Sequence, residues 1–487
     1  MKYRSIILLG FVVLVGISLI YGLADHRTVT TKSEKAYDAY LRGKDFSYRL
    51  YMNEALQEFE RATQLDANFA MAYASMALIY KDRDRKNDYE AAKAKALSLL
   101  NQVTDKERIL INLGFARADN RHDDLVKYTD ELLKKYPESF EAHEFLSGKY
   151  FGEKNYDKAI DENLIILRKD PNHAVSYNLL GYSYFYKGEY DRALQYIEKY
   201  SKMAEDQANP HDSHGEFLLD LGRYDEALVQ FQKADSIKPG LSFVMSHIGD
   251  TYLAKGMYRD AATTYLKARE LWPAEIFKAG MDDNVAWCYI LMGQTDKASA
   301  LLAEVVSRVP DDVKANAFIG RIYADKGKID NATAQLVVLR NIIKKYNETH
   351  PGASLDKVPA AKADDYLTGR IAMAKGDFNG AIDSFKKMCA GVGLPEKMLF
   401  TSQLGEAYVK ANMPDSAIDV LTSALKDNPN DSFCLKILAE AYKMNGQKEA
   451  EKGALLRYLN VMKDADDGLP SLREANAELQ KLNSGTS

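Results

Sequence analysis

Residues 242–275 read SFVMSHIGDTYLAKGMYRDAATTYLKARELWPAE. They are one copy of a 34-residue pattern that is written four times over residues 140–275. Within each copy, small and bulky apolar residues recur at i, i+3, i+4 and i+7, which is typical of amphipathic helices. A glycine separates the two halves in three copies, at Gly188, Gly222 and Gly256. Each copy is therefore predicted to form two short helices joined by a turn.

The four copies agree at several positions, which makes the repeat specific. One position carries Tyr150, Tyr184, Leu218 and Tyr252, and another carries Ala159, Ala193, Ala227 and Ala261. One helix pair cannot bury its apolar faces alone, so successive pairs must stack, and small residues let the helices approach closely. This pattern predicts a solenoid.

The period and its residue types resemble the tetratricopeptide repeat. That family places a bulky residue at position 4, small residues at 8, 20 and 27, an aromatic at 11 and proline at 32. In the copy that starts at Ser242, these positions hold Met245, Gly249, Tyr252, Ala261, Ala268 and Pro273. The resemblance implies an all-α fold, a right-handed superhelical solenoid of about twelve helix-turn-helix units.

The pattern extends over most of the chain and divides it into segments. Repeat units are expected over 36–346, starting near residues 36, 70, 106, 140, 174, 208, 242, 279 and 313, and over 362–465, starting near 362, 398 and 432. Residues 347–361 contain His350-Pro351-Gly352 and Pro359, which predicts a linker. A polar tether is expected over 25–35, and a capping helix with a tail over 466–487.

The N-terminus has the pattern of a membrane-targeting segment. Lys2 and Arg4 precede an uncharged run from Ile6 to Ala24. A run of about 19 apolar residues is near the length that spans a bilayer, and Gly22-Leu23-Ala24 fits a signal-peptidase site. Residues 1–24 are therefore expected to be a signal peptide or a transmembrane anchor, with a slight preference for the anchor. The array is expected outside the cytoplasm, tethered to the inner membrane or secreted into the periplasm after cleavage near Ala24.

Composition and motifs give no support for several functions. Charged residues make up 28% of the chain and the net charge is -5, so no nucleic-acid footprint is present. The three cysteines, Cys288, Cys389 and Cys434, indicate neither a disulfide framework nor a zinc site. His211 and His214 lie three residues apart on one helix, but two ligands are too few for zinc. No cofactor, metal or catalytic residue is predicted, and a metal-dependent hydrolase is the least favoured function.

The resemblance also implies where a partner binds. In tetratricopeptide arrays the first helix of each pair lines the concave groove, mainly through positions 2, 5, 9 and 12. In the middle repeats these positions carry acids, including Glu141 and Glu144, with aromatic residues among them. The candidate groove residues are Tyr182, Phe185, Asp212, Glu216, Asp250, Asp283 and Trp287. Later repeats place Lys314, Arg321, Arg370, Lys436 and Lys443 at these positions, with Glu406 and Glu440 between them. We therefore expect a protein or peptide partner with basic and apolar side chains, while the oligomeric state stays open.

Three stretches look like the repeat arrays of bacterial regulators: 39–43, 209–216 and 465–470. In such regulators the array often follows a DNA-binding, cyclase or kinase domain, and here only the membrane-targeting segment precedes it. A non-enzymatic interaction scaffold is therefore the favoured function. The alternative is a sensory or regulatory module that acts with a separate effector protein.

Overall fold

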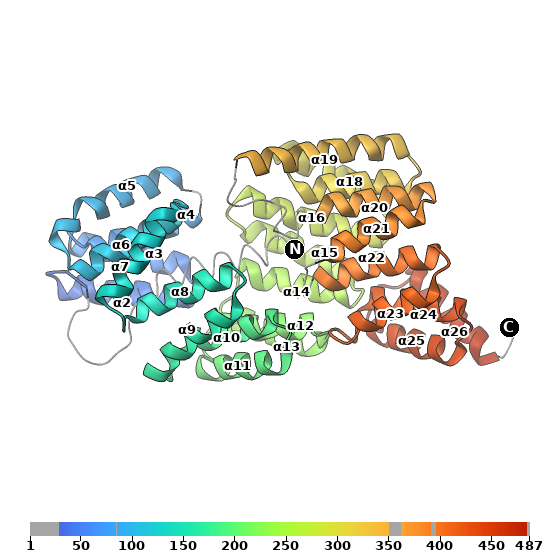
Figure 1. Cartoon of the computed structure of the whole chain (residues 1–487), viewed down its shortest axis with the longest axis horizontal. Helices are drawn as coiled ribbons and strands as arrows, with labels where there is room; N and C mark the ends of the chain where they lie inside the picture. Colours follow the sequence, from blue (N-terminus) through green and yellow to red (C-terminus); the bar gives the residue numbers. More distant parts are fainter. Residues whose placement is uncertain (1–28, 84, 350–361, 391–395, 485–487) are drawn as a thin grey trace. The chain divides into compact units, whose positions relative to one another are not determined.

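The computed structural model describes residues 29–83, 85–349, 362–390 and 396–484. Across these residues the regular structure is helical, and no strand is present. The helices follow one another as twelve pairs and a final single helix, as Figure 1 shows. The expectation of an all-α repeat fold is confirmed.

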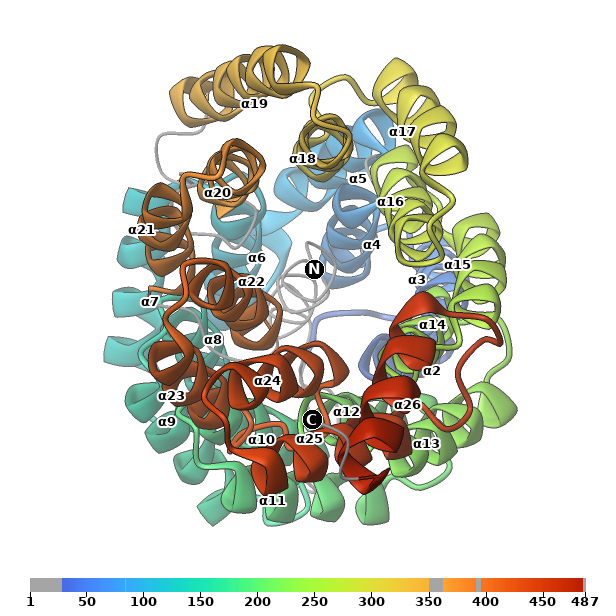
Figure 2. The same ribbon diagram turned by 90° about the vertical axis from the view of Figure 1, so that its right-hand side faces the viewer.

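The helix pairs are α2 (Glu34–Tyr48) and α3 (Met52–Leu65); α4 (Ala70–Asp82) and α5 (Lys86–Ser98), followed by the short 3-10 helix η1 (Leu100–Gln102); α6 (Asp105–Ala118) and α7 (His122–Lys135); α8 (Phe140–Gly152) and α9 (Tyr156–Lys169); α10 (Ala174–Tyr186) and α11 (Tyr190–Met203); α12 (Ala208–Asp220) and α13 (Tyr224–Ile237); α14 (Ser242–Ala254) and α15 (Tyr258–Leu271); α16 (Glu275–Leu291) and α17 (Thr295–Arg308); α18 (Val313–Asp325) and α19 (Ile329–Thr349); α20 (Ala363–Lys375) and α21 (Phe378–Cys389); α22 (Glu396–Lys410) and α23 (Pro414–Ala424); α24 (Ser432–Met444) and α25 (Lys448–Val461). The single helix α26 covers Pro470–Ser484 (Figure 2).

The chain divides into two compact parts at the middle of α12. We call the described residues up to Ser213 the N-terminal lobe and those from His214 onward the C-terminal lobe. Within each lobe, consecutive helices pack against one another, as α2 does on α3 and α14 on α15. First helices also contact the first helices of the next pair, for example α4 on α6 and α18 on α20. Each lobe is thus built from stacked pairs.

A close contact between a glycine and a large side chain sets the packing within a pair. A β-carbon on Gly249 of α14 would lie 2.6 Å from the Tyr265 ring of α15. The same contact, with the two residues 16 positions apart, joins Gly43 to Phe59, Gly215 to Phe231, Gly369 to Phe385 and Gly405 to Leu421. Because only glycine fits against these side chains, the small residue at position 8 of the repeat is a packing requirement.

The turn between the helices of a pair needs a left-handed backbone conformation. Gly222 has φ +76°, which glycine adopts without steric cost. Lys154 takes the place of glycine in the repeat that starts at Phe140, and its φ is 60°. The glycine of the sequence pattern therefore serves the turn, and the fold tolerates a lysine in one copy at the cost of some strain.

The described residues of the segment expected to be a tether over 25–35, from residue 29 onward, pack onto the N-terminal lobe. The backbone N–H of Thr30 donates to Glu107 Oε1 at 2.6 Å, and the Thr31 hydroxyl donates to Asp66 Oδ2 at 2.6 Å. Val29 is buried, and α2 begins at Glu34. The polar composition of this segment therefore reflects hydrogen bonds to the repeats, at least from residue 29 onward.

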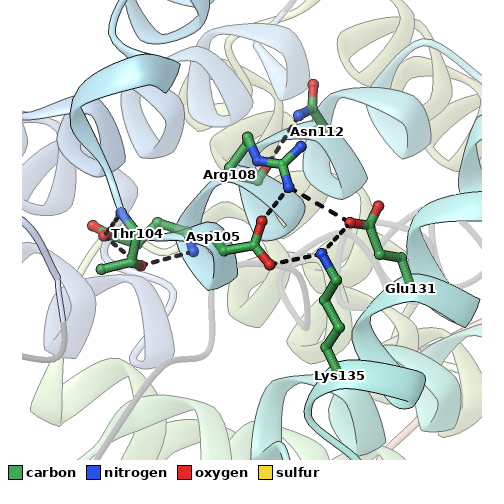
Figure 3. Close-up of polar contacts among 7 residues, drawn as sticks. Thr104, Asp105, Arg108, Asn112, Glu131 and Lys135 are labelled. Carbon is green, nitrogen blue, oxygen red and sulfur yellow. Dashed lines mark hydrogen bonds and ion pairs between the residues drawn. The ribbon is translucent and has the colours of Figure 1, made fainter.

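Polar contacts also join helices on the surface of the N-terminal lobe. Thr104 caps α6 by accepting a hydrogen bond from the N–H of Glu107. Lys135 of α7 donates to Asp105 at 2.8 Å and to Glu131 at 2.9 Å, and Arg108 also pairs with Asp105 (Figure 3). Such exposed pairs contribute little to stability, so we assign this network no functional role.

Two expected segments fall partly or wholly on residues that the structure does not describe. The linker was expected to begin at residue 347, but α19 continues to Thr349, and residues 350–361 lie outside the described part. The N-terminal apolar run also lies outside it. Among the helices that are described, none is both long and apolar enough to cross a membrane.

Candidate functional site

The aromatic candidates of the N-terminal lobe belong to the core of α10. Both Tyr182 and Phe185 are buried. The Phe185 ring packs against Tyr190, with 5.1 Å between ring centroids, and against Tyr186 at 6.2 Å. The sequence assigned these rings to partner contact; in the structure Phe185 packs against Tyr190 of α11, and Tyr182 is buried.

The acidic candidates of α12 are buried as well. Asp212 lies at the end of the N-terminal lobe, and Glu216 lies one turn later, at the start of the C-terminal lobe. Within the C-terminal lobe, Glu216 Oε1 lies 3.7 Å from His247 Nε2 of α14. His247 is itself buried. The sequence analysis did not single out His247, which lies at position 6 of its repeat, outside the four positions considered.

Asp250 of α14 is half-buried and therefore more accessible than the acids of α12. The Tyr265 hydroxyl of α15 donates to Asp250 Oδ1 at 2.7 Å. This is the same Tyr265 whose ring packs on Gly249. The repeat therefore fixes the direction of the Asp250 carboxylate through a neighbouring core side chain.

Asp283 of α16, which was expected in the groove, is buried and lies close to other charged groups. Its side chain is only 1% exposed. Burial raises its pKa well above the usual range, and the neighbouring charge of Asp312 raises it further, while Lys314 acts in the opposite direction. Asp312 caps α18 by accepting hydrogen bonds from the N–H groups of Lys314 and Ala315. A neutral, enclosed Asp283 offers no charge to a partner.

Trp287 of α16 already has neighbours on its ring. It stacks on Phe318 of α18 with 5.3 Å between centroids. The Arg321 guanidinium lies 4.6 Å from the centre of the Trp287 ring, which is a cation–π geometry. Trp287 remains half-buried, so part of the side chain can still contact a partner.

The basic residues expected in the later repeats are neutralised by acids of the C-terminal lobe. Arg370 of α20 pairs with Asp325 of α18 and Glu406 of α22, at 2.8 Å in both cases. Arg321 also pairs with Asp325, at 3.1 Å. Further along, Lys436 and Lys443 pair with Glu474 and Glu478 of α26. The sequence showed the bases but not that acids of neighbouring helices lie within reach.

Comparison with known proteins supports the repeat assignment. Family models described as tetratricopeptide repeat match residues 178–241 and 284–312. No curated protein matches the chain. Among solved structures, the chain is similar to one from the APC/C hetero-tetramer Cut9-Hcn1, at 18% identity over 92% of this chain and 76% of that one, with a TM-score of 0.45. Yeast Tom70 matches at 15% identity over 86% and 97% of the two chains, with a TM-score of 0.43.

The two matched segments lie inside a longer register of helix pairs. The region 178–241 includes α11, α12 and α13, and the region 284–312 includes α17. Helix pairs with the same glycine contact occur before, between and after these regions, at Gly43, Gly249 and Gly405. The helix-pair register thus continues outside the matched segments, and the chain contains tetratricopeptide repeats at least over residues 178–241 and 284–312.

Proposed function

We propose that the protein is a non-enzymatic scaffold that binds a protein or peptide segment on the first helices of its repeats. Stacked repeats present these helices side by side, and the curved surface of such solenoids is used for binding. The partner is expected to carry basic and apolar side chains. Its binding surface in the C-terminal lobe includes the half-buried Asp250 and Trp287, with the buried Glu216 beneath it.

The observation that best supports this proposal is the carboxylate of Asp250. It is half-buried, it is oriented by the Tyr265 hydroxyl at 2.7 Å, and it lies one repeat after Glu216, at the same position. An oriented carboxylate on a partly enclosed surface favours a cationic side chain and speeds its association. The half-buried Trp287 can add an aromatic contact of the kind that dominates affinity.

We further propose that this binding takes place outside the cytoplasm. The basis is the sequence of residues 1–24, with Lys2 and Arg4 before the apolar run. Segments of this kind direct the following chain across the membrane and leave the basic end inside. A scaffold held there, or released by cleavage near Ala24, would bind partners in the periplasm or at the membrane surface.

Cross-linking followed by variant analysis tests the binding surface. A photo-reactive residue in place of Phe243 on α14 should capture the partner, which mass spectrometry then identifies. Asp250→Lys should weaken binding of that partner and reduce its dependence on salt. The control is Asp260→Lys on α15, where the carboxylate is exposed. Equal loss with both variants, or with neither, would place the binding surface elsewhere.

A further inference from the structure

The N-terminal lobe contains three buried polar side chains that have no hydrogen-bond partner among the described residues. They are Lys44 of α2, Glu144 of α8 and Asn178 of α10. Their exposed fractions are 3%, 1% and 0%. The unpartnered atoms are the Lys44 Nζ, both Glu144 carboxylate oxygens, and both polar atoms of the Asn178 amide. Buried polar groups are nearly always satisfied, so this cluster requires an explanation.

The three side chains belong to one region of the lobe. The charges of Glu144 and Glu141 favour the charged form of the Lys44 ammonium and raise its pKa, although Lys44 donates no hydrogen bond to either. Asn178 occupies the same position of its repeat as Glu144, 34 residues later. The two helices begin side by side, because Phe140 packs edge-on against His173 with 4.6 Å between centroids.

The neighbours of Glu144 do not satisfy it. The nearest is His173, whose Nε2 lies 3.4 Å from Glu144 Oε1 and forms a long ion pair with it when the imidazole is protonated, so that Oε2 is the oxygen without any partner. His173 Nδ1 is already engaged with the Ser176 hydroxyl at 2.9 Å. The Glu141 carboxylate, in contrast, has a partner, because Lys106 Nζ lies 2.6 Å from it. Glu144 thus keeps an acceptor without a donor, and Lys44 keeps donors without an acceptor.

Burying the charged forms of Lys44 and Glu144 without hydrogen-bond partners costs free energy. Burial lowers the pKa of Lys44 to about 7, although Glu144 and Glu141 oppose the shift. Burial raises the pKa of Glu144, although His173 and Lys44 oppose that shift. A ligand that brings a donor to Glu144 and an acceptor to Lys44 would remove both penalties. The complementary ligand therefore has a positive group next to an oxygen acceptor.

We propose that Glu144, Lys44 and Asn178 form a binding site for an α-ammonium group beside a carbonyl oxygen. The ammonium would donate to Glu144, the carbonyl oxygen would accept from Lys44, and the Asn178 amide would pair with the adjoining peptide or carboxylate group. This chemistry occurs at the N-terminus of a polypeptide and in a free amino acid. The site goes beyond the scaffold function and does not use Asp250, so either proposal can fail without the other.

Three small probes and the full-length chain test the site. Glycinamide carries an ammonium and a carbonyl and mimics a polypeptide N-terminus, while glycine represents a free amino acid. N-acetylglycinamide lacks the ammonium. Glycinamide should raise the Tm of the wild type saturably, by roughly 2–4 °C at about ten times Kd, and N-acetylglycinamide should not. A glycine shift larger than that of glycinamide at equal concentration would identify the free amino acid as the source.

Variants separate a ligand site from an internal ion pair. Glu144→Gln keeps the shape of the side chain and should abolish the glycinamide shift. Lys44→Met combined with Glu144→Gln should also abolish it, and should raise the Tm without ligand because two unpartnered charges are removed. The control double variant, Lys149→Met with Glu153→Gln, alters an exposed pair 3.8 Å apart at the end of the same helix and should leave the shift unchanged. An unchanged glycinamide shift in Glu144→Gln, or an equal shift with N-acetylglycinamide, would overturn the proposal.

Discussion

The Asn430 side chain donates a hydrogen bond from Nδ2 to the carbonyl oxygen of Gly222 at 3.0 Å, although the two residues are 208 positions apart. The Tyr224 hydroxyl also donates to the carbonyl oxygen of Asn430, at 3.2 Å. These contacts join the turn between α12 and α13 to the turn before α24. The C-terminal lobe thus brings together repeats that are far apart in the sequence.

A second pair of turns extends this contact. The N–H of Asp466 donates to the Gly256 carbonyl oxygen at 3.1 Å, and Lys255 pairs with Asp464 at 2.9 Å. We call the contacts of residues 222–225 and 255–259 with residues 428–431 and 462–466 the clasp. The clasp therefore joins the turns of α12–α15 to the turns that flank α24 and α25 within the C-terminal lobe.

Gly222→Ala should open the first half of the clasp. A β-carbon at Gly222 would lie 2.1 Å from Asn428 Oδ1, and the φ of +76° is strained for alanine. We expect a loss of about 2–4 kcal/mol, combining backbone strain with overpacking. Hydrogen exchange should become faster in residues 426–431 as well as at the turn itself.

The control for this prediction is Gly293→Ala in the same lobe. Gly293 has φ +75°, and nothing lies within 4 Å of its β-carbon position. It carries the same backbone penalty, about 1–2 kcal/mol, without any contact to the clasp. If both variants lose the same stability and exchange in residues 426–431 is unaffected, the clasp does not stabilise the lobe.

Gly249→Ala should destabilise the C-terminal lobe through the contact with Tyr265. The new β-carbon would lie 2.6 Å from the ring, which cannot move without disturbing the hydrogen bond to Asp250. Overpacking of this kind costs about 1–3 kcal/mol. The matched control is Gly453→Ala on α25, where the position is helical, exposed and open.

Helix propensity alone favours alanine over glycine by about 1 kcal/mol, so Gly453→Ala should stabilise. Urea denaturation of both variants measures the two effects. A gain of stability in Gly249→Ala would show that the close glycine–aromatic contact is not a packing requirement.

The sequence predicted the local features of this fold because they repeat. The spacing within one 34-residue repeat is enough to predict the helix pairs. It also predicts a glycine in the turn, such as Gly222, and a small residue at the helix contact, such as Gly249. The clasp could not be predicted, because a contact between Gly222 and Asn430 depends on small rotations that add up over six repeats. The groove assignment had the same limit. The sequence placed Asp283 and Trp287 correctly on a first helix. It did not predict that Asp312 would lie next to Asp283 or that Phe318 would stack on Trp287.

The export proposal predicts the location of the C-terminus. An alkaline phosphatase reporter fused after Ser487 should be active, because this enzyme needs an oxidising compartment for its disulfides. A matched fusion in which residues 1–24 are deleted should be inactive. Mass analysis of the mature N-terminus separates cleavage after Ala24 from retention of the anchor. Activity that does not depend on residues 1–24 would reject the role of this segment.

Asp283→Asn should make the stability of the C-terminal lobe less dependent on pH. The folded protein holds a proton on Asp283, because burial and the charge of Asp312 raise its pKa. The native state therefore binds more protons than the unfolded state at every pH between the ordinary carboxyl value of 3.8 and the raised one. The free energy of unfolding is therefore highest, with respect to Asp283, at pH values below this window. It falls as the pH rises through the window, with a limiting slope of about 1.4 kcal/mol per pH unit.

Asparagine is neutral at every pH, so it reproduces the protonated state. The free energy of unfolding of the Asp283→Asn variant, relative to that of the wild type, should increase as the pH is raised from about 4 to 8. Urea unfolding at each pH measures this difference. Asp282→Asn is the control, because Asp282 pairs with Arg269 and Arg308 at 3.0 and 2.5 Å. Asp282 is the buried member of these ion pairs, and the loss of its charge removes one acidic partner from each of the two arginines, which should destabilise the protein at pH 7. If Asp283→Asn also destabilises at pH 7, with no trend across the window, then Asp283 is ionised in the folded protein and an anionic role in partner binding becomes possible again.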